Sequence, residues 1–282
     1  MAVEYLCRST EDLIGAYDGF LLDAYGVLVD KTGALSGAAV FLERLRTAGK
    51  PYLVLTNSAS RLPETLAAEF AAAGLAIPAE RILTSGLLLG SYFRGQGLNR
   101  ADCLVLGPRE SEIYVTRAGG QVLSPSEDLD AEVVVIADQK GFDCLELMNR
   151  TLSLVLRRLD AGKTMHLLLC NPDLIYPVGP GRYGFTAGGL AAMLGAVIRE
   201  RYPELSDPIV PLGKPDAPMF EAARRRIGAE RLVMLGDQLA TDILGANRCG
   251  IDSVLVDSGL ARKADCAAEK VRPTYYIPAL SY

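Results

Sequence analysis

Short apolar runs alternate with segments of helical periodicity along most of the chain. In the first part, the run GFLLD at 19–23 predicts a strand, and apolar residues then recur at helical spacing over 36–48. A second pair follows, with a strand over 51–57 (PYLVLTN) and a helix over 63–73. This alternation is typical of an α/β fold in which a Rossmann-like parallel sheet is covered by helices on both faces.

The last third of the chain repeats the pattern. It predicts strands at 231–237 (RLVMLGD) and 253–259 (SVLVDSG), with a helix over about 242–248 between them. The long middle segment has elements of its own, namely strands at 102–107, 132–138 and 165–171 and a helix at 144–159. We therefore predict two α/β units. A core is formed by residues 1–86 and 207–282, and a second unit is inserted over 87–206.

Small polar or acidic residues stand at the ends of three apolar strands. Asp23 follows FLL, Thr56 and Asn57 follow LVL, and Asp237 follows VMLG. The carboxyl ends of parallel strands meet at one edge of a sheet, where ligands bind, so we expect these side chains to share one site. Lys214 joins them as a candidate, because it lies in a glycine-proline turn just ahead of a predicted helix.

The acids of this set predict a metal site. Two neighbouring carboxylates repel each other, and one pKa rises unless a cation neutralises them. Mg²⁺ prefers carboxylate oxygens and water, and it commonly completes its coordination shell with a phosphate group. Lys214 and the groups near Thr56 would then hold the remaining phosphoryl oxygens, which favours phosphoryl transfer to a carboxylate.

Four motifs of the sequence resemble those of the haloacid dehalogenase-like hydrolases, in the same order and at strand ends. They are carried by Asp23, Thr56, Lys214 and the segment GDQLATD at 236–242. More narrowly, TNSASR, RILTSG, NPD, GKPDAPMFEAA and GDQLATDILGANRCGIDSVLVDSG resemble the class IIA subgroup, which includes phosphoglycolate, pyridoxal phosphate and nucleotide phosphatases. That subgroup carries a large α/β cap domain between its second and third motifs, where the inserted unit stands in this chain.

The resemblance implies a role for each motif residue. Asp23 would attack phosphorus and form an aspartyl-phosphate, which divides one difficult displacement into two easier ones. Mg²⁺ would be held by Asp23, by the backbone carbonyl of Tyr25 and by Asp237. Lys214 would neutralise charge on the nucleophile and the phosphate, and Asp242 would orient Lys214 or a metal-bound water.

The resemblance also implies a substrate-binding set. Thr56, with Asn57 and Ser58 beside it, would bind the phosphoryl group, while Asn171 and Asp173 would reach the substrate from the cap. The substrate would be a small phosphorylated metabolite, and the cap would exclude water from it. A homodimer formed through the cap is a further expectation.

Tyr25 departs from the family pattern. Phosphatases of the family usually carry Asp two residues after the nucleophile, where it protonates the leaving group and later activates water. Such general acid and base help is worth about 10²–10⁴-fold in rate. A tyrosine hydroxyl, whose ordinary pKa is about 10, is a poor general base at neutral pH but can still donate a proton or a hydrogen bond.

Three functional interpretations follow from this departure. The first is a Mg²⁺-dependent phosphoric monoester hydrolase, and the second is a metabolite-binding relative that has lost turnover along with the acid. The third is a haloacid dehalogenase, because the DAYG motif also resembles the first motif of the L-2-haloacid dehalogenases, whose carboxylate attacks carbon without a metal. The retained acids Asp237 and Asp242 favour the first interpretation.

Composition and charge argue against several kinds of partner and site. The formal net charge of −5 and the absence of a Lys/Arg stripe argue against a nucleic-acid partner. The uncharged stretch 183–198 contains four glycines and is too short to cross a bilayer, so we expect no membrane partner. Six scattered cysteines without a C-x-x-C pair argue against a zinc site. The N-terminal segment has no apolar signal core, and we therefore expect a cytoplasmic protein.

Overall fold

The chain folds into two compact units. The computed structural model describes residues 6–126, 129–179, 181–205, 207–257 and 271–281. The first unit contains residues 1–56, 63–83 and 214–282, and the second contains residues 57–62 and 84–213. The insertion predicted from the sequence over 87–206 lies within the second unit. The chain passes between the two units directly after Thr56 and directly before Lys214.

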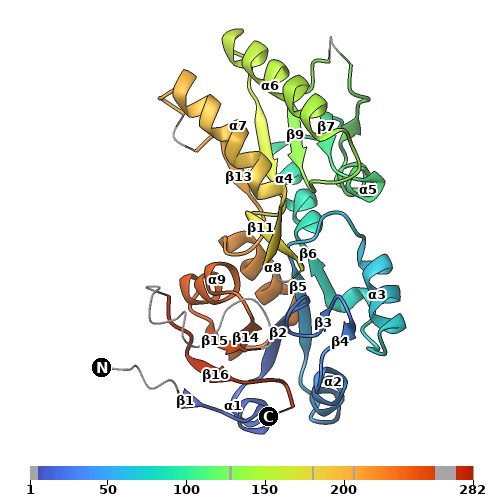
Figure 1. Ribbon diagram of the computed structural model, residues 1–282, viewed down its shortest axis with the longest axis vertical. Coiled ribbons are helices and arrows are strands. Elements are labelled where there is room, and N and C mark those ends of the chain that lie inside the picture. The colour runs from blue at the N-terminus through green and yellow to red at the C-terminus, as the bar shows by residue number, and fades with distance from the viewer. Residues whose placement is uncertain (1–5, 127–128, 180, 206, 258–270, 282) are drawn as a thin grey trace. The chain divides into compact units, whose positions relative to one another are not determined.

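A seven-stranded sheet forms the centre of the first unit, in the order β1-β16-β15-β14-β2-β5-β6 (Figure 1). Its strands are β1 (Leu6–Cys7), β2 (Gly19–Asp23), β5 (Tyr52–Thr56), β6 (Ile82–Thr84), β14 (Leu232–Gly236), β15 (Asp252–Val256) and β16 (Tyr275–Ile277). Every strand pair from β1 through to β5 runs parallel. The predicted α/β fold with a Rossmann-like parallel sheet is therefore confirmed. The strand order reverses beside β2, which is where such sheets bind ligands.

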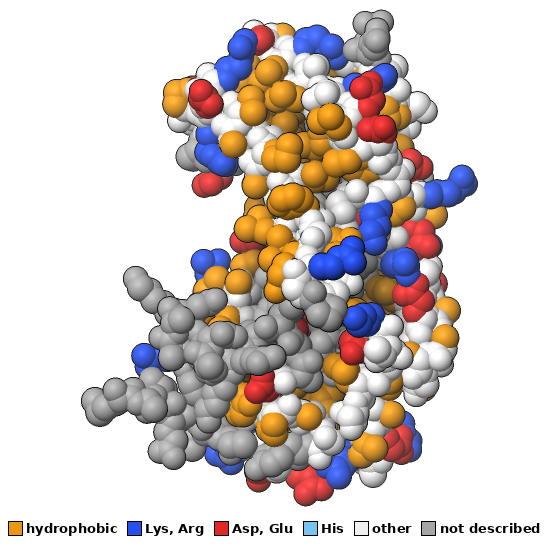
Figure 2. Space-filling model, in the orientation of Figure 1, with side chains coloured by type: hydrophobic (Ala, Val, Ile, Leu, Met, Phe, Trp, Pro, Cys, Tyr) orange, Lys and Arg blue, Asp and Glu red, His pale blue; other side chains and the backbone are white. Residues whose placement is uncertain are grey.

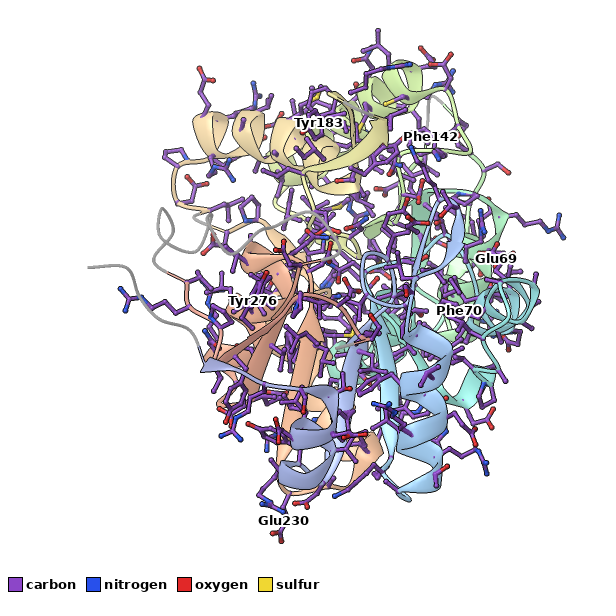
Figure 3. The ribbon with its side chains drawn as sticks, turned by 60° about the horizontal axis from the view of Figure 1, so that its bottom comes forward. Glu69, Phe70, Phe142, Tyr183, Glu230 and Tyr276 are labelled. Atoms are coloured by element: carbon purple, nitrogen blue, oxygen red, sulfur yellow. The ribbon has the colours of Figure 1, made fainter. Side chains whose placement is uncertain are left out.

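The sheet of the first unit is buried on both faces. In β2, Phe20 and Leu22 join one core cluster, while Leu21 between them points to the opposite face and is also fully buried. A strand buried on both faces needs a nearly continuous apolar run, as GFLLD is. In α3, Phe70 is buried in the core and its neighbour Glu69 is exposed (Figure 3).

Helices accompany this sheet, and they include those that the periodicity predicts over 36–48 and 63–73. They are α1 (Thr10–Ala16), α2 (Ala38–Thr47), α3 (Pro63–Ala72), the short 3-10 turn η1 (Ala79–Arg81), α8 (Ala217–Ile227), the π-helical turn η3 (Leu239–Ile243) and α9 (Leu244–Arg248). A small antiparallel pair, β3 (Val29–Asp30) and β4 (Gly33–Ala34), follows β2. The helix predicted from Asp242 differs, because α9 begins only at Leu244 and a wider turn precedes it.

The second unit has a parallel sheet of its own, in the order β13-β10-β9-β7-β8. Its strands are β7 (Asp102–Leu106), β8 (Gln121–Val122), β9 (Val133–Ile136), β10 (His166–Leu169) and β13 (Ile209–Pro211). Its helices are η2 (Ser85–Leu88), α4 (Leu89–Gln96), α5 (Arg109–Arg117), α6 (Cys144–Asp160) and α7 (Ala187–Arg201). The hairpin formed by β11 (Ile175–Gly179) and β12 (Arg182–Phe185) completes it.

Large exposed apolar side chains gather on the second unit (Figure 2). Most belong to the β11–β12 hairpin, its approach and α7: Leu174, Ile175, Val178, Tyr183, Phe185, Met193 and Val197. Tyr183, labelled in Figure 3, is 64% exposed. The homodimer expected through this unit stays a prediction. Within the described ranges, each helix is too short or too polar to cross a lipid bilayer.

Candidate functional site

Four charged side chains are buried together in the first unit. Asp23 ends β2, Asp237 directly follows β14, Asp242 lies in η3, and Lys214 precedes α8. None of the four is more than 5% exposed. Burial of a charge is costly unless the charge is paired or binds a metal, so this cluster is the candidate functional site of the first unit.

Lys214 links two of the acids. Its Nζ lies 2.7 Å from Oδ1 of Asp23 and 2.7 Å from Oδ1 of Asp242, and it also donates to the carbonyl of Leu55 over 3.2 Å. An ammonium group has three protons, which is enough for each of these contacts. Burial on its own would lower the pKa of Lys214, but the negative charges of Asp23 and Asp242 outweigh it and raise that pKa. The lysine therefore stays charged.

Asp242 is fully buried beside Lys214. Burial, together with the charge of Asp23, raises the pKa of Asp242 to about 7, although the contact with Lys214 opposes that shift. One lysine does not neutralise the carboxylates gathered here, and a further cation would hold them in the charged form.

The main chain around Asp242 is shaped for this carboxylate. Its Oδ2 accepts a hydrogen bond from the N–H of Gln238 over 3.2 Å. A Cβ at Gly236 would lie 2.2 Å from the Cβ of Asp242, so only glycine fits there. Gln238, rather than Asp242, is the N-cap residue of the turn. The other oxygen of Asp242 faces Lys214.

Three carboxylates of the cluster could hold a metal ion. Asp23, Asp237 and Asp242 each offer an oxygen, and these oxygens all lie within 4.8 Å of one another. Carboxylate oxygens are the ligands of hard divalent cations. Gly26 leaves room for the carboxylate of Asp237, because a Cβ at residue 26 would lie 2.2 Å from Oδ2 of Asp237. The φ of Gly26, +93°, also favours glycine. Sequence reasoning missed Gly26, although its place directly after Tyr25 was a signal.

Asp23 has one carboxylate oxygen engaged by hydrogen bonds. Its Oδ1 accepts from Lys214 Nζ and, over 2.7 Å, from the backbone N–H of Ala24. Oδ1 accepts both of these hydrogen bonds, and Oδ2 takes part in neither. An oxygen held in this way fixes the rotamer, and the second oxygen keeps its nucleophilic electron pairs.

Tyr25 lies in the turn that follows Asp23, with its side chain 47% exposed. The turn is closed by the N–H of Gly26, which donates to the carbonyl of Val29 over 2.8 Å. The side chain thus stands at the surface of the first unit, two residues from the buried carboxylate. The metal contact expected for the Tyr25 carbonyl stays a prediction.

The expected substrate-binding residues are divided between the two units. Thr56 ends β5 in the first unit, whereas Asn57 and Ser58 belong to the second. Within the second unit, Nδ2 of Asn57 donates to Oδ1 of Asp173 over 3.4 Å, and the N–H of Asp173 donates to Oδ1 of Asn171 over 3.1 Å. These three residues therefore form one cluster, and their roles toward a substrate stay predictions.

Two family models match the chain. The model described as haloacid dehalogenase-like hydrolase matches residues 20–121, and the model described as HAD-hydrolase-like matches residues 211–281. The chain belongs to the haloacid dehalogenase-like hydrolases. The first match contains Asp23 and Thr56, and the second contains Lys214, Asp237 and Asp242. The resemblance stated from the motifs is therefore confirmed.

Curated relatives extend over nearly the whole chain. Dihydroxyacetone phosphatase of Corynebacterium glutamicum is 29% identical over 93% of this chain and 89% of its own length. Ribonucleotide monophosphatase NagD of Escherichia coli is 27% identical over 93% of this chain and 96% of its own length. Among solved structures, a possible sugar phosphatase from Cytophaga hutchinsonii is 28% identical and superposes with a TM-score of 0.85, with 99% of each chain covered. These relatives support the class IIA assignment within the family.

Proposed function

We propose that the protein is a Mg²⁺-dependent phosphatase that acts on a small phosphorylated metabolite through an aspartyl-phosphate on Asp23. The observation that carries this proposal is the buried cluster in which Lys214 lies 2.7 Å from both Asp23 and Asp242. Asp237 lies within the same group of carboxylates. Relatives that are named phosphatases support the assignment.

The residues of the cluster divide the chemistry among them. Oδ2 of Asp23 attacks phosphorus, the new O–P bond forms, and the bond to the leaving oxygen breaks with its electron pair on that oxygen. Lys214 holds Oδ1 of Asp23 in place and offsets negative charge that develops on the phosphoryl oxygens. Attack of water on the aspartyl-phosphate then releases inorganic phosphate and restores Asp23.

The acids that the lysine does not neutralise fit a divalent cation. Asp23 and Asp237, with the carbonyl of Tyr25, would hold Mg²⁺, which supplies positive charge to the transferring phosphoryl group. Asp242 is the second carboxylate that holds Lys214, beside Asp23. Metal binding would keep these buried carboxylates ionised.

Tyr25 gives specific support to a second candidate function. A half-exposed tyrosine stands where the family's phosphatases carry an acid, which is compatible with a metabolite-binding relative without turnover. Dehalogenation is less well supported, because carboxylate attack on carbon gives no role to a buried group of three acids.

Hydrolysis of p-nitrophenyl phosphate, measured with Mg²⁺ and with EDTA, tests the proposal. We expect turnover only with the metal, and we expect Asp23→Asn to lower it by about 10³-fold or more, because the nucleophile is lost. Phosphate binding without turnover would favour the binding protein. Chloride release from 2-chloropropionate that persists in EDTA would instead support the dehalogenase.

A further inference from the structure

The segment that follows Thr56 is held by a hydroxyl group of the second unit. Residues 57–62 belong to that unit, together with residues 84–213. Oγ of Ser85, at the start of η2, lies 2.9 Å from the carbonyl oxygen of Asn57 and 3.2 Å from that of Ser58. Ser85 is fully buried, so water does not compete for its proton.

Helix α5 holds the rest of the segment. Oγ of Ser111 donates to the carbonyl of Ala59 over 2.7 Å, and the hydroxyl of Tyr114 donates to the carbonyl of Arg61 over 2.6 Å. Thr84 Oγ1 lies 2.8 Å from the same tyrosine oxygen. Because the tyrosine proton is used on Arg61, Thr84 must be the donor in that contact. Four carbonyl groups of the segment, at residues 57, 58, 59 and 61, are thus tied to the hydroxyl groups of Ser85, Ser111 and Tyr114.

Glycines allow these side chains to reach the segment. A Cβ at Gly107 would lie 2.5 Å from Oγ of Ser111, and a Cβ at Gly86 would lie 2.7 Å from the ring of Tyr114. Ser111 and Tyr114 are only 1% and 2% exposed. Because larger residues would displace both hydroxyl groups, the arrangement is a packed part of the second unit rather than a chance surface contact.

The held carbonyls determine where the neighbouring N–H groups point. In a planar trans peptide, the carbonyl of one residue and the N–H of the next point in opposite directions. With the carbonyls of Asn57 and Ser58 turned toward Ser85, the N–H groups of Ser58 and Ala59 are directed away from it. Backbone N–H groups on one side of a turn form a site for an anion such as phosphate.

We propose that Ser85 is a positioning residue for phosphoryl binding, with Ser111 and Tyr114 as its supports. By fixing the main chain at 57–61, these hydroxyl groups orient the N–H groups of Ser58 and Ala59, which we take as donors to a phosphoryl group. The inference rests on the proposed phosphatase function. It assigns the geometry of the phosphate-binding segment to side chains that do not themselves contact the substrate.

Ser85→Ala tests this role, with Thr151→Ala as the matched control. Thr151 is also fully buried in the second unit, and its hydroxyl donates to a backbone carbonyl, that of Leu147, over 2.7 Å within α6. Each variant removes one buried hydroxyl group that bonds to the backbone, and Thr151→Ala also loses a buried methyl group, so its loss of thermal stability should be at least as large as that of Ser85→Ala. Only Ser85→Ala should change phosphate binding.

The readout is the division between KM and kcat, with competitive inhibition by inorganic phosphate. For Ser85→Ala we expect KM for p-nitrophenyl phosphate and the inhibition constant of phosphate to rise about tenfold, while kcat changes by less than about threefold, since binding is lost equally in ground and transition states. Thr151→Ala should leave both constants unchanged. Equal constants in the two variants would overturn the inference.

Two further variants keep the test decisive if Ser85→Ala does not fold. The increase in KM should be smaller for Ser111→Ala, which releases Ala59, and smallest for Tyr114→Phe, which releases Arg61. An unordered series would overturn the inference. If the wild type hydrolyses no phosphate ester, the proposed function fails. Calorimetric titration with inorganic phosphate then tests the positioning role of Ser85 separately. Weaker binding by Ser85→Ala than by wild type supports the positioning role, whereas equal binding, or no binding by either, overturns it.

Discussion

The ammonium group of Lys214 lies 2.7 Å from the carboxylate of Asp242, 28 residues further along the chain, and neither side chain is more than 3% exposed. The same ammonium lies 2.7 Å from Asp23. The lysine thus separates two carboxylates that would otherwise repel each other in a buried site. Its charge therefore stabilises a buried group of carboxylates.

Lys214→Met should therefore destabilise the metal-free protein strongly. Removing one partner of a buried ion pair leaves an uncompensated charge, which costs about 3–5 kcal/mol in the free energy of unfolding. Urea unfolding in EDTA measures the loss. The double variant Lys214→Met with Asp242→Asn should recover a large part of this loss but no turnover.

Lys163→Met is the matched control for this experiment. Its ammonium lies 2.8 Å from Asp130, but both side chains are about half exposed. An exposed pair contributes about 0–1 kcal/mol. Equal losses of stability in Lys163→Met and Lys214→Met would show that the buried cluster does not depend on its lysine.

The stability of the metal-free protein should fall as pH rises from about 4 to about 7. Burial, with the charge of Asp23, raises the pKa of Asp242 to about 7, above its ordinary value of 3.8. In this range the folded chain binds more protons than the unfolded chain, so unfolding becomes easier as pH rises. Thermal unfolding in EDTA across this range tests the slope, and Asp242→Asn should flatten it.

Added Mg²⁺ should oppose this loss. A bound cation favours the ionised form of the nearby Asp242, whose pKa is raised to about 7 by burial and by the charge of Asp23, while Asp242 itself contacts Lys214. The increase in melting temperature caused by Mg²⁺ should therefore be larger at pH 8 than at pH 5.5. An increase that does not depend on pH would place the metal outside this cluster.

Much of the fold could be predicted because its central strands are nearly continuous apolar runs. GFLLD at β2 and the corresponding runs at β5 and β14 are buried on both faces, and such runs are distinctive in a sequence. The two-residue strand β1 and the β11–β12 hairpin went unpredicted. Short strands are stabilised mainly by their tertiary contacts, and they contain too few residues to show a periodic pattern in the sequence.

The convergence of the buried charges could also be predicted from the sequence. Asp23 and Asp237 stand at the ends of adjacent parallel strands, so topology alone brings them to one edge. The hydroxyl contacts of Ser85, Ser111 and Tyr114 could not be predicted. A hydrogen bond to a backbone carbonyl 27 or more residues away leaves no pattern of residue types.

Gly26→Ala should weaken Mg²⁺ binding. The new Cβ would lie 2.2 Å from Oδ2 of Asp237, and the carboxylate would have to move. Displaced metal ligands and their supports typically cost about 10–100-fold in metal affinity. Titration of the melting temperature with Mg²⁺ measures this effect separately from turnover.

Gly33→Ala controls for backbone strain in that experiment. Gly33 also has a positive φ, of +126°, but a Cβ there meets nothing within 4 Å. Both variants should lose stability through strain, and only Gly26→Ala should lose metal affinity. The same loss of affinity in Gly33→Ala would assign the effect to the turn as a whole.

Tyr25 should make the rate depend steeply on the leaving group. Without a carboxylic acid at this position, aryl phosphates and phosphoanhydrides, whose leaving groups depart without a proton, should be hydrolysed faster than alkyl phosphates. A series of phosphate esters of graded leaving-group pKa measures this dependence. Equal rates across the series would mean that another group supplies the proton or that chemistry does not limit the rate.

Tyr25→Asp should reduce that dependence by restoring a general acid. Because the Tyr25 side chain is 47% exposed, a smaller acid fits without repacking the core. Turnover of alkyl phosphates should rise, by about 10²-fold or more if proton transfer limits the rate, while aryl phosphates gain much less. Tyr25→Phe serves as the control, since it removes the hydroxyl without adding an acid. A folded Tyr25→Asp protein that gains nothing on alkyl phosphates would show that the missing acid is not what limits this chain.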